Sequence, residues 1–498
     1  MLFNSLEFLL FFPAVLCVCF ILPARVRYIW LLVASYFFYM CWNAKYALLL
    51  LFSTAVTYLS GLFMERIKHK DWDDRRIIRW KKLCVAASFG LNLAVLFFFK
   101  YFDFAFENLN HLMGLIHVQL NRPAFDVLLP VGISFYTFQA LSYTMDVYRD
   151  EIYAEKNFLR YALFVSFFPQ LVAGPIERSK NLLRQLAEPP RANIDNLREG
   201  VLLMLWGYVL KVVLADRIAI MVDTIYGDPA AYAGWYLIVA TVLFAFQIYC
   251  DFAGYSTIAM GAAKVLGIRL MENFDAPYLA RSVGEFWRRW HISLSSWFRD
   301  YLYIPLGGNR KGRWRKYFNL MVVFLVSGLW HGANWSFVVW GGLNGLYQII
   351  GELTKPARDK IVRTLGFHRE SLGHRVFQML VAFALVDFSW IFFRAEGIEK
   401  ALDIIKSMRT TGNPWIMVDG SLFGCGLNRQ NFTLMMLCIG LLLGADICKY
   451  KGVRIREVIA AQDIWVRWLV FSVAICFILL VGIWGSGYNA ANFIYFQF

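Results

Sequence analysis

The chain of 498 residues is 59% hydrophobic and only 17% charged, whereas soluble proteins carry roughly 25% charged residues. This composition excludes a disordered chain and argues against a soluble enzyme, so the apolar excess must face lipid. The net charge of +15 lies in short basic blocks between long apolar runs, which indicates cytoplasmic loops of a membrane protein and not a nucleic-acid partner.

Twelve apolar stretches follow one another along the chain, and a helix needs roughly 20 apolar residues to cross a bilayer. They predict an all-α polytopic membrane protein with ten to twelve transmembrane helices, in which residues 1–498 form one integral-membrane domain. No basic residue precedes the first stretch, which therefore reads as a membrane helix and not as a cleavable signal peptide. The stretches are residues 5–23, 28–43, 45–64, 83–102, 125–145, 199–222, 235–266, 317–331, 334–353, 376–394, 430–447 and 465–486.

Two regions depart from a regular span. Pro169 and Pro175 interrupt the apolar segment 160–176, which predicts a broken or re-entrant helix. The stretches 317–331 and 334–353 follow each other closely and are compatible with a re-entrant hairpin. Irregular backbone at membrane depth is tolerated only where it is buried in protein or lines a cavity, so we expect both regions to do so.

The loops differ in charge. The segment Leu279–Lys316 holds nine Lys and Arg residues against two acidic ones, and three further loops are also basic. The positive-inside rule places these loops in the cytoplasm and both termini outside. The connection 395–430 then lies outside, where we expect a small cap. The three further basic loops are Glu65–Lys82, Lys355–Arg375 and Lys449–Arg467.

His331 is the most informative polar residue. The stretch Tyr317–Trp330 before it has 14 residues, which is roughly 21 Å of helix and falls short of the roughly 30 Å hydrocarbon core. If this helix starts at the cytoplasmic face, His331 ends inside the membrane. An ionisable residue at that depth is typical of a functional site; a core histidine with satisfied hydrogen bonds is the alternative interpretation.

Other polar residues also lie in the apolar stretches. Gln247 and Asp251 are four residues apart and share one helix face. Asp251 needs a partner, because an unpaired carboxylate in apolar surroundings would become neutral. Ser134 and Gln139 lie in the stretch 125–145. Such residues either line a channel or hold helices together, and both interpretations stay open.

The basic segment Leu279–Lys316 alternates Arg with Trp, Phe and Tyr, which is typical of an interfacial amphipathic helix. It contains His291 close to Arg288 and Arg289. A neutral imidazole in a dry site is suited to general-base work on an alcohol, so His331 and His291 point to group transfer to a hydroxyl. The nine cysteines form no CxxC pair, so we expect neither a disulfide framework nor a metal site.

Six segments in chain order carry a resemblance to a known family. The chain resembles the membrane-bound O-acyltransferase superfamily over nearly its whole length, and within it the bacterial branch of alginate O-acetylation and D-alanyl transfer proteins. The closing NFIYFQF (492–498) is similar to the alginate-acetylation members. The six segments are PVGISFYTFQALSYTMDVYR (130–149), FFPQLVAGPIER (167–178), YCDFAGYSTIAMG (249–261), NFDAPY (273–278), EFWRRWHISLSSWFRDYLYIPLGGNR (285–310) and SGLWHGANWSFVVWG (327–341).

The resemblance implies a membrane-embedded fold with a thin central partition and a tunnel. It also implies a donor thioester, acetyl-CoA or an acyl-phosphopantetheine, that approaches from the cytoplasm, with no bound cofactor. The acyl group would reach an acceptor on the outer side. His331 stands in the position of the family's essential histidine, and His291 matches a second motif position where some relatives carry Asn.

Further site residues follow from the same resemblance together with the charge pattern. Basic residues of the segment Leu279–Lys316 would hold the donor's phosphates, with topology anchoring as their alternative role. Polar and aromatic residues at membrane depth would line the tunnel. The donor-binding candidates are Arg288, Arg289, Arg299, Arg310 and Lys311, and the tunnel-lining candidates are Trp330, Asn334, Gln247, Asp251, Ser134 and Gln139.

The bacterial branch implies acetylation of an extracytoplasmic polysaccharide at the inner membrane, with an SGNH-type acetyltransferase as the outer partner. A D-alanyl transfer to teichoic acid from a carrier protein is the alternative within the family. A transporter or flippase and a scaffold that only docks the outer partner are alternatives outside it. Transporters often carry paired short spans in corresponding positions of two halves, and the sequence shows no such pairs.

Overall fold

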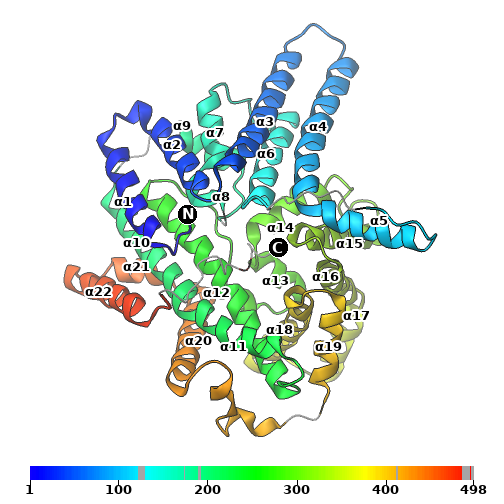
Figure 1. Cartoon of the computed structure of the whole chain (residues 1–498), viewed down its shortest axis with the longest axis vertical. Coiled ribbons are helices and arrows are strands. Elements are labelled where there is room, and N and C mark those ends of the chain that lie inside the picture. The colour runs from blue at the N-terminus through cyan, green and yellow to red at the C-terminus, as the bar shows by residue number, and fades with distance from the viewer. Residues whose placement is uncertain (122–128, 173, 189–191, 411–412, 485–493, 495–498) are drawn as a thin grey trace. The chain divides into compact units, whose positions relative to one another are not determined.

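The computed structural model describes residues 1–121, 129–172, 174–188, 192–410, 413–484 and 494 (Figure 1). Within these residues every regular element is a helix, so the predicted all-α fold class is confirmed. The chain divides into two compact units. Unit 1 comprises Met1–Val201 and Ala259–Met271, and unit 2 comprises Leu202–Ile258 and Glu272–Phe498.

In the described part of the chain, six helical segments are long and apolar enough to cross a membrane. The other predicted spans coincide with helices that are shorter or more polar, among them α1 (Leu6–Ile21) and α2 (Arg27–Met40). The polytopic membrane character is confirmed, whereas the number of ten to twelve crossings stays a prediction. The six segments are Ala44–Lys68, Asp74–Gly114, Trp235–Val265, Leu372–Arg394, Arg429–Tyr450 and Ile464–Val481.

Unit 1 is built around α3 (Ala47–Lys68), which packs against α4 (Asp74–Leu96) and α6 (Ile133–Tyr148). Nearly every residue of α6 is buried. Helix α6 begins at Ile133, within the predicted span 125–145. Residues 125–128 of that span lie outside the described part. The other elements of unit 1 include η1 (Ala24–Val26), η2 (Ala44–Tyr46), η3 (Phe97–Tyr101), α5 (Phe102–Gly114) and α9 (Ser179–Ala187).

The predicted interruption in 160–176 is present in unit 1. One residue separates helix α7 (Phe158–Ser166) from the short α8 (Phe168–Leu171). Pro169 lies in the first turn of α8, where its missing N–H group leaves no helical hydrogen bond unmade. The apolar segment is thus a broken helix and not a continuous span.

The predicted span 199–222 is longer and less regular than expected. Helix α10 (Ile194–Tyr208) continues into the π-helical η4 (Val209–Ala215) and then into α11 (Asp216–Gly227). A π-helical insertion frequently marks a functional site. Here η4 is buried throughout and places Lys211 among the helices of unit 2, next to α12 (Trp235–Val265).

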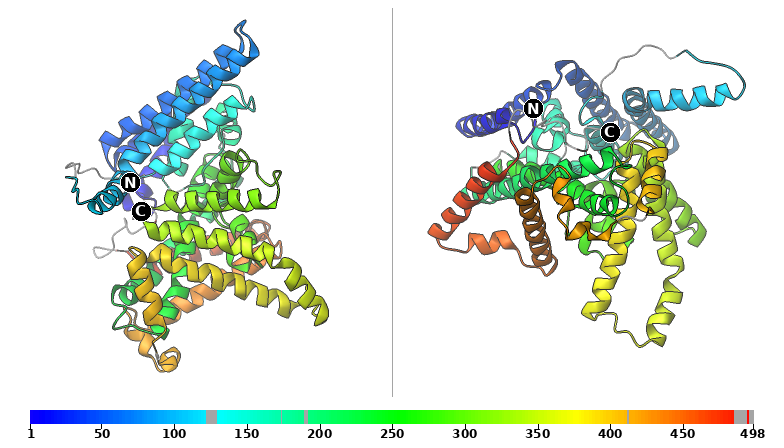
Figure 2. Two further views of the ribbon diagram at one scale, coloured as in Figure 1. Left: turned by 90° about the vertical axis from the view of Figure 1, so that its right-hand side faces the viewer. Right: turned by 60° about the horizontal axis from the view of Figure 1, so that its bottom comes forward.

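Helices α15 (Arg313–His331) and α16 (Trp335–Leu353) form a tightly packed hairpin (Figure 2). The hairpin was predicted, but α15 begins at Arg313 and not at residue 317. Its two helices can approach closely because Gly328 and Gly341 have no Cβ atom. A Cβ atom at either position would lie 2.2 Å from a carbonyl oxygen of the facing helix. The turn between the helices directly follows His331.

The described remainder of unit 2 combines short helices with three candidate membrane spans. The connection 395–430, predicted as a cap, contains α19 (Ile398–Met408), η7 (Pro414–Met417) and η8 (Ser421–Gly424). The other elements are η5 (Pro277–Leu279), α13 (Val283–Arg289), α14 (Ile292–Phe298), η6 (Arg299–Tyr303), α17 (Lys355–Thr364), α18 (Leu372–Arg394), α20 (Arg429–Tyr450), α21 (Ile455–Ala460) and α22 (Ile464–Val481).

Candidate active site

His331 is the last residue of α15 and lies inside a box of aromatic rings. Its ring centroid is 4.9 Å from that of Trp330, 5.0 Å from Trp340 of α16 and 5.5 Å from Phe393 of α18. The histidine is 5% exposed. Three helices of unit 2 thus enclose one imidazole in apolar surroundings, where electrostatic interactions are stronger than in water.

His291 lies beside this box, at the start of α14. Its ring centroid is 6.4 Å from that of His331 and 4.7 Å from that of Phe252. Burial lowers the pKa of His291 to about 3, so its ring is neutral at physiological pH. Its backbone has φ 45° and ψ 53°, a left-handed conformation that is uncommon for a residue with a side chain. Such local strain is concentrated at functional sites.

The structure therefore brings together two histidines that are 40 positions apart in the sequence. Trp330, predicted to line the tunnel, packs beside both of them, with its ring 6.0 Å from that of His291 and 4.9 Å from that of His331. Asn334 begins the next helix, and its side-chain oxygen accepts a hydrogen bond of 2.9 Å from the backbone N–H of Ser336. This cap gives Asn334 a structural role at the turn.

Asp251 has the partner that its position requires. The Nζ atom of Lys211 lies 2.5 Å from the Oδ1 atom of Asp251 and 2.8 Å from the Oδ1 atom of Asp216. The second oxygen of Asp251 accepts a hydrogen bond of 2.8 Å from the backbone N–H of Ile494. The carboxylate thus ties α12 to η4, as the helix-joining interpretation predicts. Gln247, one turn earlier, is buried.

Ser134 and Gln139 have partners within unit 1. Gln139 donates a hydrogen bond of 2.6 Å to the carbonyl of Phe164 and accepts one from Gln170. Ser134 lies 3.5 Å from the Nζ atom of Lys100. These contacts hold α6 against its neighbours, and the role of both residues in a tunnel stays a prediction.

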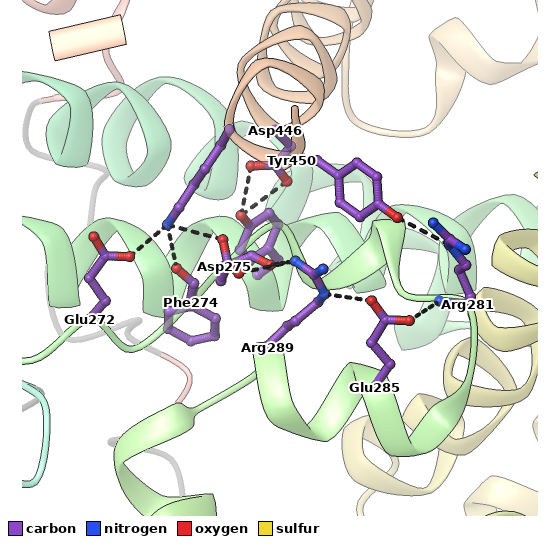
Figure 3. A network of polar contacts seen from close by, with 10 residues as sticks. Glu272, Phe274, Asp275, Arg281, Glu285, Arg289, Asp446 and Tyr450 are labelled. Atoms are coloured by element: carbon purple, nitrogen blue, oxygen red, sulfur yellow. Dashed lines mark hydrogen bonds and ion pairs between the residues drawn. The ribbon is translucent and has the colours of Figure 1, made fainter. Parts of the chain in front are cut away.

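Arg289 belongs to a polar network at the end of α20, and Figure 3 shows how these side chains converge. Its guanidinium lies 3.0 Å from a carboxylate oxygen of Glu285 and 3.0 Å from one of Asp275. It also lies over the ring of Tyr450, 5.0 Å from the centroid. Lys449, the neighbour of Tyr450, contacts Asp275 as well, at 3.6 Å. Arg289 therefore braces α13 against α20.

The other predicted donor-binding residues are more accessible. Arg288, Arg310 and Lys311 are exposed, and Arg299 lies 2.9 Å from its neighbour Asp300. Their exposure leaves them able to contact a soluble ligand. Donor binding by these five basic residues stays a prediction, and Arg289 is the member that contacts two carboxylates of the protein.

Two polar residues of unit 2 were not predicted. Lys211 stands alone in the apolar run VLKVVLA, and the rule that drew attention to Asp251 applies to it equally. Asn273 contacts His291 through its side-chain oxygen, 3.2 Å from the Nδ1 atom. It lies in the family-like segment NFDAPY, but nothing in the spacing of that segment connects it to the histidine.

The fold and the enclosed histidines define a membrane-embedded enzyme for group transfer. Residues 133–386 match the membrane-bound O-acyltransferase family. The chain belongs to this family and is an acyltransferase, as the sequence predicted. The structure adds that its two motif histidines lie close together, with ring centroids 6.4 Å apart, and that both contact Trp330.

Curated relatives cover most of the chain. A probable alginate O-acetylase of Azotobacter vinelandii is 37% identical over 91% of this chain and 85% of the relative. A peptidoglycan O-acetyltransferase of Helicobacter pylori is 33% identical over 82% of this chain and 80% of the relative. A teichoic acid D-alanyltransferase of Bacillus subtilis is 31% identical over 46% of this chain and 60% of the relative.

Proposed function

We propose that the chain passes an acetyl group from a cytoplasmic thioester to a polysaccharide outside the bacterial inner membrane. The observation that carries this proposal is the enclosed pair His331 and His291 in a member of an O-acyltransferase family. Relatives named for alginate and peptidoglycan O-acetylation are similar over at least 82% of the chain, which supports acetyl as the group and polysaccharide as the acceptor class.

In the proposed reaction His331 is the general base. It takes the proton of the attacking hydroxyl while the hydroxyl oxygen bonds to the thioester carbonyl carbon. The carbon–sulfur bond then breaks, and the proton returns to the departing sulfur. The products are an ester and a free thiol, so the reaction needs no redox partner. In the alternative arrangement His331 carries the acyl group itself before the hydroxyl attacks.

The donor is proposed to bind at the segment Leu279–Lys316, whose nine basic and two acidic residues give a net charge of +7. Such a surface attracts the phosphates of coenzyme A or of a phosphopantetheine arm on an acyl carrier protein. Arg288, Arg299, Arg310 and Lys311 are the exposed candidates. The phosphates would stay on the cytoplasmic side, because moving charges into hydrocarbon is strongly unfavourable.

Only the neutral acyl group would then cross to the outer side. We propose that an SGNH-type acetyltransferase receives it there and transfers it to the polymer. A narrow passage beside His331 suits this task, because an open pore would dissipate the membrane potential. The small and aromatic residues of SGLWHG (327–332) would line such a passage.

D-alanyl transfer is the second candidate within the family. The D-alanyltransferase relative is similar over 46% of this chain, whereas the O-acetylating relatives extend over most of it. The longer similarity favours acetyl transfer. A transporter or flippase would move the donor or a lipid without breaking the thioester, and the family membership favours bond-breaking chemistry instead.

The test uses the purified full chain in sealed proteoliposomes of known orientation. Acetyl-CoA with a labelled acetyl group is placed on the side of the basic loops, and an SGNH-type partner with alginate oligosaccharide on the other side. We expect labelled oligosaccharide only when the chain is present. Labelled product only when donor and acceptor share one side would contradict transfer across the membrane. Transfer of D-alanine from a charged carrier protein, without acetyl transfer, would establish the alternative.

A further inference from the structure

Asn273 lies against His291 because backbone hydrogen bonds join residues 273–275 to the short link between α13 and α14. The backbone N–H of Ile292 donates a hydrogen bond of 3.0 Å to the carbonyl of Asn273, and that of Asp275 donates one of 2.9 Å to the carbonyl of Arg289. These two bonds fix the backbone around Asn273 next to the left-handed turn at His291. The Asn273 side chain is consequently 1% exposed and has little freedom to move.

The orientation of the Asn273 amide follows from its other contacts. The backbone N–H of Ser293 lies 3.2 Å from the Oδ1 atom, and the Ser293 hydroxyl lies 2.9 Å from it. A backbone N–H can only donate, so the atom that faces it must be the oxygen and not the nitrogen of the amide. Asn273 therefore presents an acceptor at this point.

This acceptor determines which nitrogen of His291 carries the proton. The Nδ1 atom lies 3.2 Å from the same Asn273 oxygen, and a hydrogen bond between them requires the proton on Nδ1. The Ser293 hydroxyl lies farther from Nδ1, at 3.5 Å, and its proton goes to the Asn273 oxygen at 2.9 Å. A neutral imidazole has one proton, so Nε2 keeps its lone pair. Burial lowers the pKa of His291 to about 3, which keeps the ring neutral. Phe252, Trp330 and His331 are the rings packed against it, and of these only His331 titrates.

We propose that Asn273 is a positioning residue, which holds His291 in the tautomer whose Nε2 atom accepts a hydrogen bond from the reacting groups beside His331. The proposal rests on the proposed function, because it assigns the reacting groups to a position beside the two histidines. A histidine in the wrong tautomer keeps its place but loses its function. Asn273 would thus control activity without touching the substrate.

The Asn273→Asp variant tests this role cleanly. Among the described residues, the Nδ2 atom of Asn273 has no hydrogen-bond partner, so the replacement removes no hydrogen bond that the structure contains. Aspartate keeps the acceptor oxygen, and its negative charge raises the pKa of a neighbouring imidazole. Asn273→Leu is similar in size but removes the acceptor. Ser293→Ala is the matched control: it removes the hydroxyl 3.5 Å from the Nδ1 atom but keeps both the Asn273 oxygen and the Ser293 backbone N–H.

The first readout is release of free CoA from acetyl-CoA by each variant across a pH series, with the SGNH-type partner and alginate oligosaccharide present to accept the acetyl group. We expect Asn273→Leu to lower kcat by roughly 10²-fold at every pH. Asn273→Asp is expected to keep activity at alkaline pH and to lose it at about pH 6, because protonated His291 no longer accepts a hydrogen bond. Ser293→Ala should retain the wild-type profile. Equal losses in both Asn273 variants with unshifted profiles would overturn the proposal.

The second readout is independent of activity. Solid-state NMR of ¹⁵N-histidine-labelled protein in lipid reports which ring nitrogen is protonated, and a His291→Gln variant identifies the His291 signals. We expect the proton on Nδ1 in the wild type, and a loss of this preference in Asn273→Leu. A wild-type proton on Nε2 would overturn the proposal even if acetyl transfer is confirmed. Conversely, a wild-type chain that does not consume acetyl-CoA but shows Nδ1–H would contradict only the proposed donor.

Discussion

Lys211 is a buried ionisable side chain of unit 2 that is held by opposite charges. Lys211 is 1% exposed and lies between the carboxylates of Asp216 and Asp251. An isolated charge in apolar surroundings is strongly unfavourable, and hydrogen-bonded pairing offsets this penalty. Lys211 contacts two carboxylates, whereas the side chain of Asp251 contacts one cation and one backbone N–H. Replacing Lys211 therefore leaves more buried charge without a partner than replacing Asp251 does.

These contacts predict which of two substitutions destabilises the protein more. Lys211→Met leaves two buried carboxylates without their cation and should lower stability by roughly 3–5 kcal/mol. Asp251→Asn leaves Lys211 paired with Asp216 and keeps an oxygen that can accept the Ile494 N–H, so its effect should be smaller. Thermal unfolding in detergent, followed by size-exclusion chromatography, measures both. A lower midpoint for Asp251→Asn than for Lys211→Met would contradict the pairing.

Whether a site residue could be predicted from the sequence depends on how much of its environment lies close to it in the chain. His331 and Asp251 were found from the sequence because a polar group in an apolar run is visible without knowledge of the fold. Lys211 offered the same signal, yet its neighbours did not reveal that it would face Asp251. Asn273 offered none, because its contact with His291 depends on backbone hydrogen bonds between segments that are distant in the sequence. Sequence spacing reports helical faces well and loop pairings poorly.

At the scale of elements, the hairpin of α15 and α16 depends on glycine. A Cβ atom on Gly328 would lie 2.2 Å from the carbonyl oxygen of Phe337. This oxygen belongs to the backbone, so no change of side-chain rotamer relieves the clash. His331 follows three residues later, so any separation of the helices displaces the imidazole. Gly351 of α16 has open space around it and serves as a control within the same hairpin.

We expect Gly328→Ala to destabilise the protein by about 1–3 kcal/mol through overpacking and to lower acyl transfer through the shift of His331. Gly351→Ala should leave activity unchanged and raise helix stability by up to about 1 kcal/mol. Unfolding midpoints and acetyl-CoA turnover measure the two effects. If both variants behave alike, close packing at Gly328 does not position the histidine.

Helix α13 supplies a second contrast at this scale, between two adjacent arginines. Arg288 is exposed, whereas Arg289 contacts Glu285, Asp275 and the ring of Tyr450. Arg288→Ala should weaken acetyl-CoA binding and its dependence on salt, since only this guanidinium is open to a phosphate. Arg289→Ala should chiefly loosen the contact of α13 with α20. Titration of acetyl-CoA at two salt concentrations, beside thermal unfolding, separates these outcomes, and unchanged binding in Arg288→Ala would make that residue a topology anchor.

At the scale of the whole molecule, hydropathy and charge predicted the helical membrane fold. Composition alone could not set the boundaries: α15 begins before its apolar stretch, and 199–222 belongs to a longer run with a π-helical segment. Helix ends depend on capping and packing, which a hydropathy window does not register. The resemblance of the closing NFIYFQF lies largely outside the described residues, which include only Ile494 from it.

The charge pattern also predicts the orientation of unit 2 in the membrane. Loop 355–375 is basic and belongs in the cytoplasm, whereas loop 223–234 carries few charges and belongs outside. His368 and Ala230 are exposed residues in these loops, so single cysteines there report the two sides. In sealed vesicles, a membrane-impermeant maleimide should label His368→Cys and Ala230→Cys from opposite faces, measured against the labelling of the parent chain. Labelling of both from the same face would contradict this topology.

The central claim is that this membrane protein transfers an acyl group with His331. The direct test measures transfer of labelled acetyl from acetyl-CoA to oligosaccharide, with the SGNH-type partner present, by wild type, His331→Ala and His368→Ala, the last replacing an exposed histidine as a control. We expect His331→Ala to insert and unfold like wild type but to lose roughly 10²-fold or more of its turnover, whereas His368→Ala remains active. Acetylation by His331→Ala at the wild-type rate would contradict the account.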